Sequence, residues 1–359
     1  MKKQLFYIIV LFSFPAIFIS KSFSQGNNAV YSKFDFIPGE KVIYYDDFTS
    51  ENVGDFPAQW NTNGSGEIVT TENFPGRWFQ LTKGGFFIPE AKENFSENFT
   101  IEFDIVPKNT TNSEGVYGID LMLVSGTLQN PGEGGAIPGK AGIKITPGFD
   151  LVSWTNWSAA DEGYKDQGSS AFKFVPNEKY HISFWIQKQR IRLYANENKI
   201  LDLPRGLIAG YTYNIFRMET SDEANPIISN FRIAAGLPDM RNKLLKDGKI
   251  ISYGIHFDVN SDKVKPESYA TLKEIAQILK DNPTLKIKIV GHTDSDGDDI
   301  SNMDLSKRRS ISVKKELTDN FGIDAGRIET DGKGESEPLN GNSSSVDKAK
   351  NRRVEFIKL

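Results

Sequence analysis

Cysteine is absent from this 359-residue chain, and histidine occurs only three times. Without cysteine the chain can form no disulfide and no lipid anchor attached through a thiol. The scattered histidines do not make a zinc site, and no Ser-His-Asp or Cys-His set is present, so we expect no metal, no cofactor and no enzyme. Neither sign of charge dominates: 43 Lys and Arg residues stand against 47 Asp and Glu residues, for a net charge of −4. No basic field therefore attracts nucleic acid or anionic lipid.

Long hydrophobic runs are also lacking beyond the N-terminus. There, Lys2 and Lys3 precede an apolar stretch at residues 5–19, and small residues follow it before Gln25. This pattern predicts a secretory signal peptide at residues 1–24. The alternative, an uncleaved membrane anchor, is less favoured because the stretch is short for a membrane span.

Residues 25–235 have the pattern of β-structure. Between Phe99 and Ile105, apolar and polar residues alternate with a period of two, as in a half-buried strand. The segment from Tyr180 to Pro204 indicates three strands joined by two short turns. Further candidate strands are short and bounded by Gly, Pro or Asn: residues 41–48, 78–87, 117–124, 142–146, 213–220 and 227–233. So many short strands predict an all-β sandwich or a barrel.

These strands resemble a jelly-roll sandwich of the concanavalin-like or laminin-G-like kind. Many such modules bind glycans and others are spacers, so the resemblance implies a polysaccharide partner as one option. Trp154, Trp157 and Tyr164 either form a stacking platform for sugar rings or pack in the core. Some members of this superfold hydrolyse glycans with a Glu-x-Asp-x-x-Glu strand. Here Pro107 replaces the last Glu after Glu102, so an N-terminal glycoside hydrolase is kept only as an alternative.

Composition changes at residues 236–249, a polar stretch containing Pro and Gly that predicts a linker. Beyond it, residues 250–359 alternate strands and helices in the order βαβαβ, which predicts an α/β domain. The expected strands are residues 250–257, 285–291 and 353–358, and the expected helices are residues 266–280 and 302–321.

Two charged residues stand out in this C-terminal half. Asp294 follows a predicted strand, and Arg309 recurs at four-residue spacing with Leu305 and Val313, on or beside the apolar stripe of a helix. A guanidinium in that place needs an anion. Asp294 could satisfy it in an internal ion pair. Alternatively, the two could together bind a ligand that carries an ammonium group beside a carboxylate.

Five ordered phrases in this half, IHFDVNSDKVKPES, GHTD, NMDLSKRRSISV, GKGESEP and NRRVEF, resemble the OmpA-like C-terminal domain. The resemblance implies noncovalent binding of peptidoglycan, in which Asp294 holds the amine and Arg309 the carboxylate of diaminopimelate in the stem peptide. The other residues that the matching phrases place in the expected site are Thr293, Asn302, Leu305, Arg353, and Asp258 and Asn260 in a flanking loop. Within the last phrase, Asn351, Arg352 and Arg353 are expected to brace the site. The acidic loop after Asp294 lacks EF-hand spacing, so we expect a solvated loop.

The sequence therefore predicts an exported two-domain protein in the periplasm or at the outer membrane of a Gram-negative bacterium. Its first half is predicted to be a sandwich and its second half to bind peptidoglycan. An alternative keeps that binding activity but makes the first half an outer-membrane β-barrel, because alternating strands are also what a barrel requires.

Overall fold

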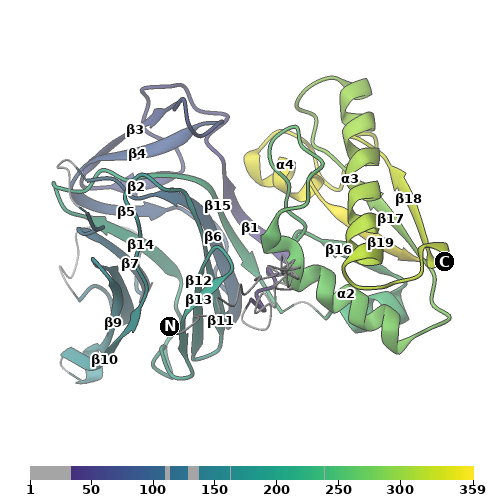
Figure 1. Cartoon of the computed structure of the whole chain (residues 1–359). Helices are drawn as coiled ribbons and strands as arrows, with labels where there is room; N and C mark the ends of the chain where they lie inside the picture. Colours follow the sequence, from purple (N-terminus) through teal and green to yellow (C-terminus); the bar gives the residue numbers. More distant parts are fainter. Residues whose placement is uncertain (1–33, 110–113, 128–136, 162, 238) are drawn as a thin grey trace, which may run out of the picture. The chain divides into compact units, whose positions relative to one another are not determined.

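The N-terminal half folds into two antiparallel sheets in the computed structural model, and the C-terminal half forms an α/β domain (Figure 1). The structure describes residues 34–109, 114–127, 137–161, 163–237 and 239–359. The predicted signal peptide lies outside the described residues.

Within the described residues, the first sheet has eight strands, in the order β13-β12-β11-β6-β15-β4-β3 with β1 paired to β15. They are β1 (Lys41–Asp46), β3 (Ser65–Val69), β4 (Trp78–Lys83), β6 (Asn98–Val106), β11 (Tyr180–Gln187), β12 (Arg190–Ala195), β13 (Asn198–Leu203) and β15 (Ile227–Ala235). The second sheet has seven strands, in the order β10-β9-β8-β7-β14-β5-β2. They are β2 (Trp60–Thr62), β5 (Gly85–Pro89), β7 (Ile119–Ser125), β8 (Ala141–Pro147), β9 (Leu151–Ser158), β10 (Gly163–Ala171) and β14 (Ile215–Thr220), with a 3-10 turn η1 (Ala159–Asp161) between β9 and β10.

Apolar side chains of both sheets meet in one core. Phe103 of β6 stacks on Phe231 of its own sheet at 5.5 Å and contacts Phe216 of the other sheet at 5.7 Å between ring centroids. Ile101 and Ile105 lie in the same core, as the period of two requires. The predicted all-β sandwich is confirmed.

The sequence prediction for residues 78–87 was wrong in one respect. Instead of one strand, the segment forms β4 and β5, which lie in different sheets. The chain changes sheet at Gly84 and Gly85, where an added Cβ would lie 2.8 Å from Asp222 N and 2.7 Å from Gly64 Cα. The two glycines therefore permit a close backbone approach that a larger residue would block.

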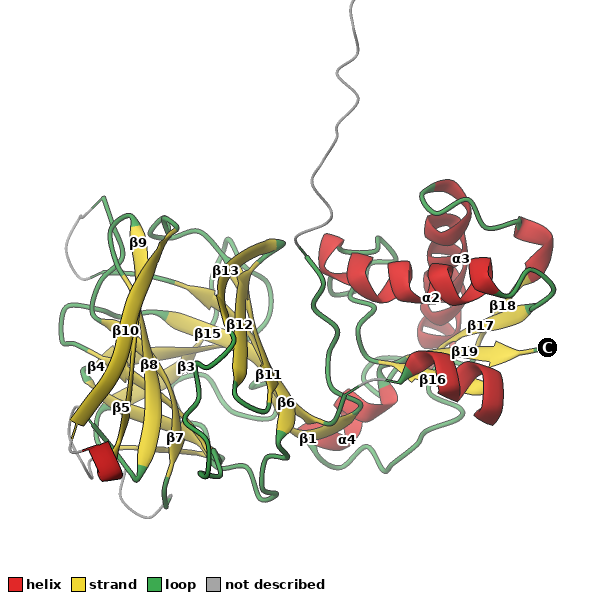
Figure 2. Cartoon of the chain, turned by 90° about the horizontal axis from the view of Figure 1, so that it is seen from below, coloured by secondary structure: helices red, strands yellow, loops and turns green. Residues whose placement is uncertain are grey.

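The C-terminal domain has a four-stranded sheet in the order β16-β19-β17-β18, in which β17 and β18 are parallel and the other pairs antiparallel. Figure 2 shows α2 and α3 on one face of this sheet. The elements are β16 (Lys249–Ser252), η3 (Pro266–Ser268), α2 (Tyr269–Asp281), β17 (Ile287–Gly291), α3 (Asp299–Asp319), η4 (Ala325–Arg327), β18 (Ile328–Gly332), α4 (Ser345–Asn351) and β19 (Val354–Lys358). No helix among the described residues is long and apolar enough to cross a membrane.

The stretch predicted as a linker, residues 236–249, is instead helical in part. It contains α1 (Met240–Asn242) and the π-helical turn η2 (Lys243–Asp247), which Gly248 ends at a φ of 78°. Met240 and Leu244 are buried in the core of the C-terminal domain. The polar composition hid these two anchors because charged residues surround them in the sequence.

Small residues bring the first half of α3 close to the sheet. A Cβ on Gly291 of β17 would lie 2.4 Å from the carbonyl oxygen of Ser306, and one on Gly332 would lie 2.4 Å from Lys307 N. Ser306 and Ser310 are fully buried at this contact. The close approach fixes the start of α3 against the loop that follows β17, where the predicted site lies.

Candidate functional site

Asp294 lies in the loop after β17 and is 7% exposed. One carboxylate oxygen accepts a hydrogen bond from the backbone N–H of Asp296 at 3.1 Å. The other oxygen accepts a bond from Arg352 Nη1. The carboxylate is therefore held in a defined position at the end of the strand.

Arg309 projects from α3 toward the loop before α2. Its Nε donates to the Ser261 carbonyl at 2.9 Å, its Nη2 donates to the Asp258 carbonyl at 3.3 Å, and its guanidinium lies 4.8 Å from the centroid of the Phe257 ring. Burial lowers the pKa of Arg309 to about 10, although the charge of Asp294 acts in the opposite direction. The guanidinium stays charged at neutral pH, and its Nη1 makes no hydrogen bond to the residues that the structure describes.

Asp294 and Arg309 interact electrostatically, but they form no direct ion pair in the described part of the chain. The pair partner of Asp294 is Arg352. The internal Asp294–Arg309 pair that the sequence left open is therefore wrong. Asp294 and Arg309 therefore do not neutralise each other through direct contact, although Asp294 is already paired with Arg352.

Arg352 is the residue whose role the sequence understated. It follows α4, and its Nη2 lies 3.4 Å from the carboxylate of Asp47, just beyond β1 of the sandwich. Its guanidinium lies 4.9 Å from the centroid of the Tyr45 ring. Burial alone would lower the pKa of Arg352, but Tyr45, Asp47 and Asp294 together outweigh burial and raise the pKa further.

The loop residues predicted from the FDVNSD phrase flank Arg309 through their backbone. The Asp258 side chain is 63% exposed, and its carboxylate lies 3.9 Å from Lys265 Nζ. Asn260 is exposed, with a left-handed φ of 56° that Asn tolerates in turns. The loop therefore supplies carbonyl acceptors that orient the guanidinium.

Asn302 and Thr293 lie beside the acid rather than facing Arg309. The Asn302 side-chain amide donates to the Asp294 carbonyl at 3.3 Å, to the Asp296 carbonyl at 3.1 Å and to Glu335 Oε2 at 2.6 Å. The Thr293 hydroxyl is buried without a hydrogen bond to the described residues. Asn302 thus orders the loop that carries Asp294.

The remaining predicted residues have different surroundings. Leu305 is partly buried on α3. Arg353 is buried and bonds Glu355 at 2.8 Å and the carbonyl of Glu337 at 3.0 Å. Its partners are therefore groups of its own domain, and the structure does not bring it to Asp294 and Arg309.

The acidic loop before α3 has structural partners. Asp298 caps α3 by accepting a bond from Ser301 N at 2.9 Å, and Asp296 pairs with Lys348 at 2.6 Å. Within the described residues, no group of three or more His, Asp or Glu side chains is placed to hold a metal.

The three aromatic residues suggested as a sugar platform do not share one surface. Trp154 packs on the main core of the sandwich, whereas Trp157 is 2% exposed and lies in a separate cluster on the other face of its sheet. Tyr164 pairs with Trp157 across β10 and β9 and is 54% exposed. The three residues therefore do not form one sugar-binding platform. A polysaccharide partner for the sandwich remains a prediction.

Glu102, the residue of the hydrolase alternative, is 2% exposed. It lies 3.3 Å from Arg232 Nη1 and 3.5 Å from His181 Nε2. These cations hold the pKa of Glu102 at about 2 although burial alone would raise it. A carboxyl group whose pKa is lowered in this way is a poor proton donor to a glycosidic bond.

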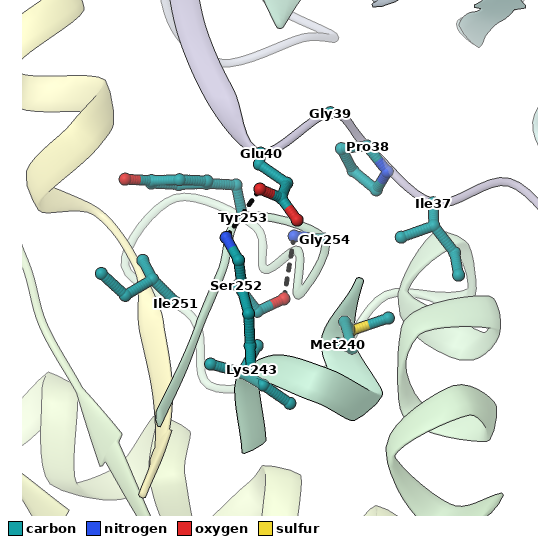
Figure 3. Close-up of a pocket in the computed structure, with 11 residues that line it drawn as sticks. Ile37, Pro38, Gly39, Glu40, Met240, Lys243, Ile251, Ser252, Tyr253 and Gly254 are labelled. Atoms are coloured by element: carbon teal, nitrogen blue, oxygen red, sulfur yellow. Dashed lines mark hydrogen bonds and ion pairs between the residues drawn. The ribbon is translucent and has the colours of Figure 1, made fainter. Parts of the chain in front are cut away.

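A hollow lies near the start of β1, away from Asp294 and Arg309 (Figure 3). Its lining residues are Ile37, Pro38, Gly39, Glu40, Met240, Lys243, Ile250, Ile251, Ser252, Tyr253 and Gly254. The two charged groups in it, Lys243 and Glu40, already pair with each other at 2.6 Å. We therefore assign it no ligand.

Comparisons with known proteins found matches to the C-terminal half of the chain. The family model described as OmpA family matches residues 256–352. Outer membrane porin F of Pseudomonas aeruginosa is 39% identical over 105 residues, which are 29% of this chain and 30% of the relative. Probable lipoprotein YiaD of Escherichia coli is 42% identical over 102 residues, 28% of this chain and 46% of the relative. The match thus spans less than half the length of either relative, and neither is named as an enzyme.

Among solved structures, the crystal structure of the peptidoglycan-associated lipoprotein from Burkholderia pseudomallei matches with a TM-score of 0.29 and 26% identity. The match covers 34% of this chain and 98% of that chain.

Proposed function

Because residues 256–352 form a domain of the OmpA family, we propose that this protein anchors noncovalently to peptidoglycan in the cell envelope of a Gram-negative bacterium. The ligand is diaminopimelate in the stem peptide, whose side chain ends in an ammonium group beside a carboxylate. Asp294 receives the ammonium and Arg309 the carboxylate. Binding of this kind needs complementary charge and no covalent chemistry.

The observation that carries this proposal is the separation of the two charges. Arg309 is oriented by the Ser261 and Asp258 carbonyls and retains Nη1 for a ligand oxygen, while Asp294 is held by the Asp296 N–H and by Arg352. A carboxylate is met well by a planar guanidinium, and an ammonium is met well by a partly buried carboxylate. Both partners are oriented before the ligand arrives, which lowers the entropic cost of binding.

The exported location is part of the same proposal. The matched relatives include a porin of the outer membrane and a probable lipoprotein. A protein that binds the wall from the periplasm or from the outer membrane fits these relatives and the predicted signal peptide.

The test is sedimentation of the purified chain with insoluble peptidoglycan sacculi. Replacement of the charge in Arg309→Ala or Asp294→Ala should reduce the bound fraction at least about tenfold, since each removes a charge-assisted contact worth roughly 1.5–3 kcal/mol. Arg308→Ala is the matched control, because Arg308 is adjacent in sequence but pairs with Asp304 and Asp262 at the surface. Circular dichroism should show the same fold for all variants. If both site variants still sediment like the unchanged chain, the assignment is wrong.

A further inference from the structure

The carboxylate assigned to the ligand ammonium is linked to the sandwich through one cation. Residues 34–359 belong to a single compact unit by their contacts. Within it, Arg352 donates to Asp294 from Nη1, and its Nη2 lies 3.4 Å from Asp47 Oδ2. Asp47 and Asp294 thus share one guanidinium, although the two acids belong to different halves of the chain.

The sandwich also fixes where that guanidinium lies. Its central carbon lies over the ring of Tyr45, 4.9 Å from the centroid, a distance typical of a cation–π contact. The Tyr45 hydroxyl donates to Asn230 Oδ1 at 3.1 Å, and the Asn230 amide donates to Asp104 Oδ2 at 3.0 Å. Tyr45 is therefore tied to β15 and β6, and Arg352 rests on a framework that the C-terminal domain does not provide.

We infer that Asp47 and Tyr45 are positioning residues for the wall-binding site, because they hold Arg352 in a place that leaves Asp294 available to a ligand ammonium. The inference rests on the proposed function and adds the sandwich as a contributor to it. It gives the N-terminal half a role in ligand binding that needs no ligand of its own.

The physical reason is competition for one carboxylate. A guanidinium has a planar fork that can meet a carboxylate through two parallel hydrogen bonds. With Asp47 present, Nη2 of Arg352 is directed to the sandwich and only Nη1 reaches Asp294. Without the Asp47 charge, only the contact with Tyr45 opposes a two-bond contact between Arg352 and Asp294. That contact would occupy the oxygens that the ligand ammonium requires.

The experiment is calorimetric titration of the full chain with a muropeptide whose stem peptide contains meso-diaminopimelate. Asp47→Asn should weaken binding on the order of tenfold, a common size for coupling between neighbouring sites. The change keeps an oxygen for the bonds that Asp47 Oδ1 accepts from Thr49 N at 3.1 Å and Thr49 Oγ1 at 2.7 Å. Asp55→Asn is the matched control, because Asp55 is an exposed sandwich acid bonded to Asn52.

A second background separates positioning from a general structural effect. In a chain that carries Arg352→Gln, the further change Asp47→Asn should cause no additional loss, since Asp47 acts through Arg352. An additive loss in that background would overturn the inference, as would equal affinities of Asp47→Asn and the unchanged chain. Either result would leave the proposed function standing if the unchanged chain binds. Failure of the unchanged chain to bind the muropeptide would instead remove the proposed function, and this inference with it.

Discussion

At the scale of single residues, His181 gives the sandwich a pH dependence that can be measured. Its Nδ1 lies 2.8 Å from Asp104 Oδ1, its Nε2 lies 3.5 Å from Glu102, and the His256 ring is 5.8 Å away. Arg232 and Lys179 face the same two acids, at 3.3 Å and 4.0 Å. Burial alone would lower the pKa of His181, but the two carboxylates outweigh it and raise the pKa to about 10.

The folded chain therefore keeps a proton on His181 that the unfolded chain releases near the ordinary pKa of about 6.5. Its contribution to the free energy of unfolding is complete below that value and is lost as the pH rises through about 10. Urea unfolding across this range should show falling stability. His181→Gln should cost about 3 kcal/mol at neutral pH and make the decline shallower, because it removes the cation that two buried carboxylates share. An unchanged pH slope in the variant would contradict this assignment.

At the scale of elements, the contact between α3 and the sheet depends on having no side chain at Gly291. Gly291→Ala would place a Cβ 2.4 Å from a backbone oxygen, which cannot move aside as a flexible side chain could. We expect a loss of about 1–3 kcal/mol in the free energy of unfolding from overpacking. Gly341→Ala is the control, since its Cβ would meet only Ser343 Oγ at 3.9 Å. Equal denaturation midpoints for the two variants would show that α3 can shift away from β17 at little cost.

Some helices and strands could be predicted from the sequence pattern, and others could not. Strands β6 and β11 were predictable because their apolar residues alternate toward the core. Strand β10, with the sequence GYKDQGSSA, was missed because it is an exposed edge strand without an apolar face. Helix α4 was missed because it has only seven residues, of which two, Val346 and Ala349, are apolar. The sequence predicts an element only where burial gives its apolar residues a regular spacing. Strand β10 and helix α4 have no such spacing.

The same limit applies to the site. The sequence placed Asp294 after a strand and Arg309 on a helix. The structure has Asp294 after β17 and Arg309 on α3. The last phrase indicated that Arg352 braces the site, but its second partner, Asp47, was not predictable because that acid lies 305 residues away in the chain. A contact over such a distance depends on how the strands and helices assemble, which local spacing does not encode.

At the scale of the whole molecule, the net charge of −4 means that the protein has no general electrostatic attraction for an anionic polymer. Under the proposed function, wall binding comes from the local charges of Asp294, at 7% exposure, and Arg309, which is also partly buried. Salt screens exposed charges within about 10 Å at 0.1 M but screens enclosed charges much less. Sedimentation with sacculi should therefore weaken less than about tenfold between about 0.05 M and about 0.5 M NaCl. A basic protein adsorbed through many exposed lysines is the comparison, and it should be released over the same range. If this chain were released as completely, binding would be a diffuse surface effect, and the geometry around Asp294 would not explain it.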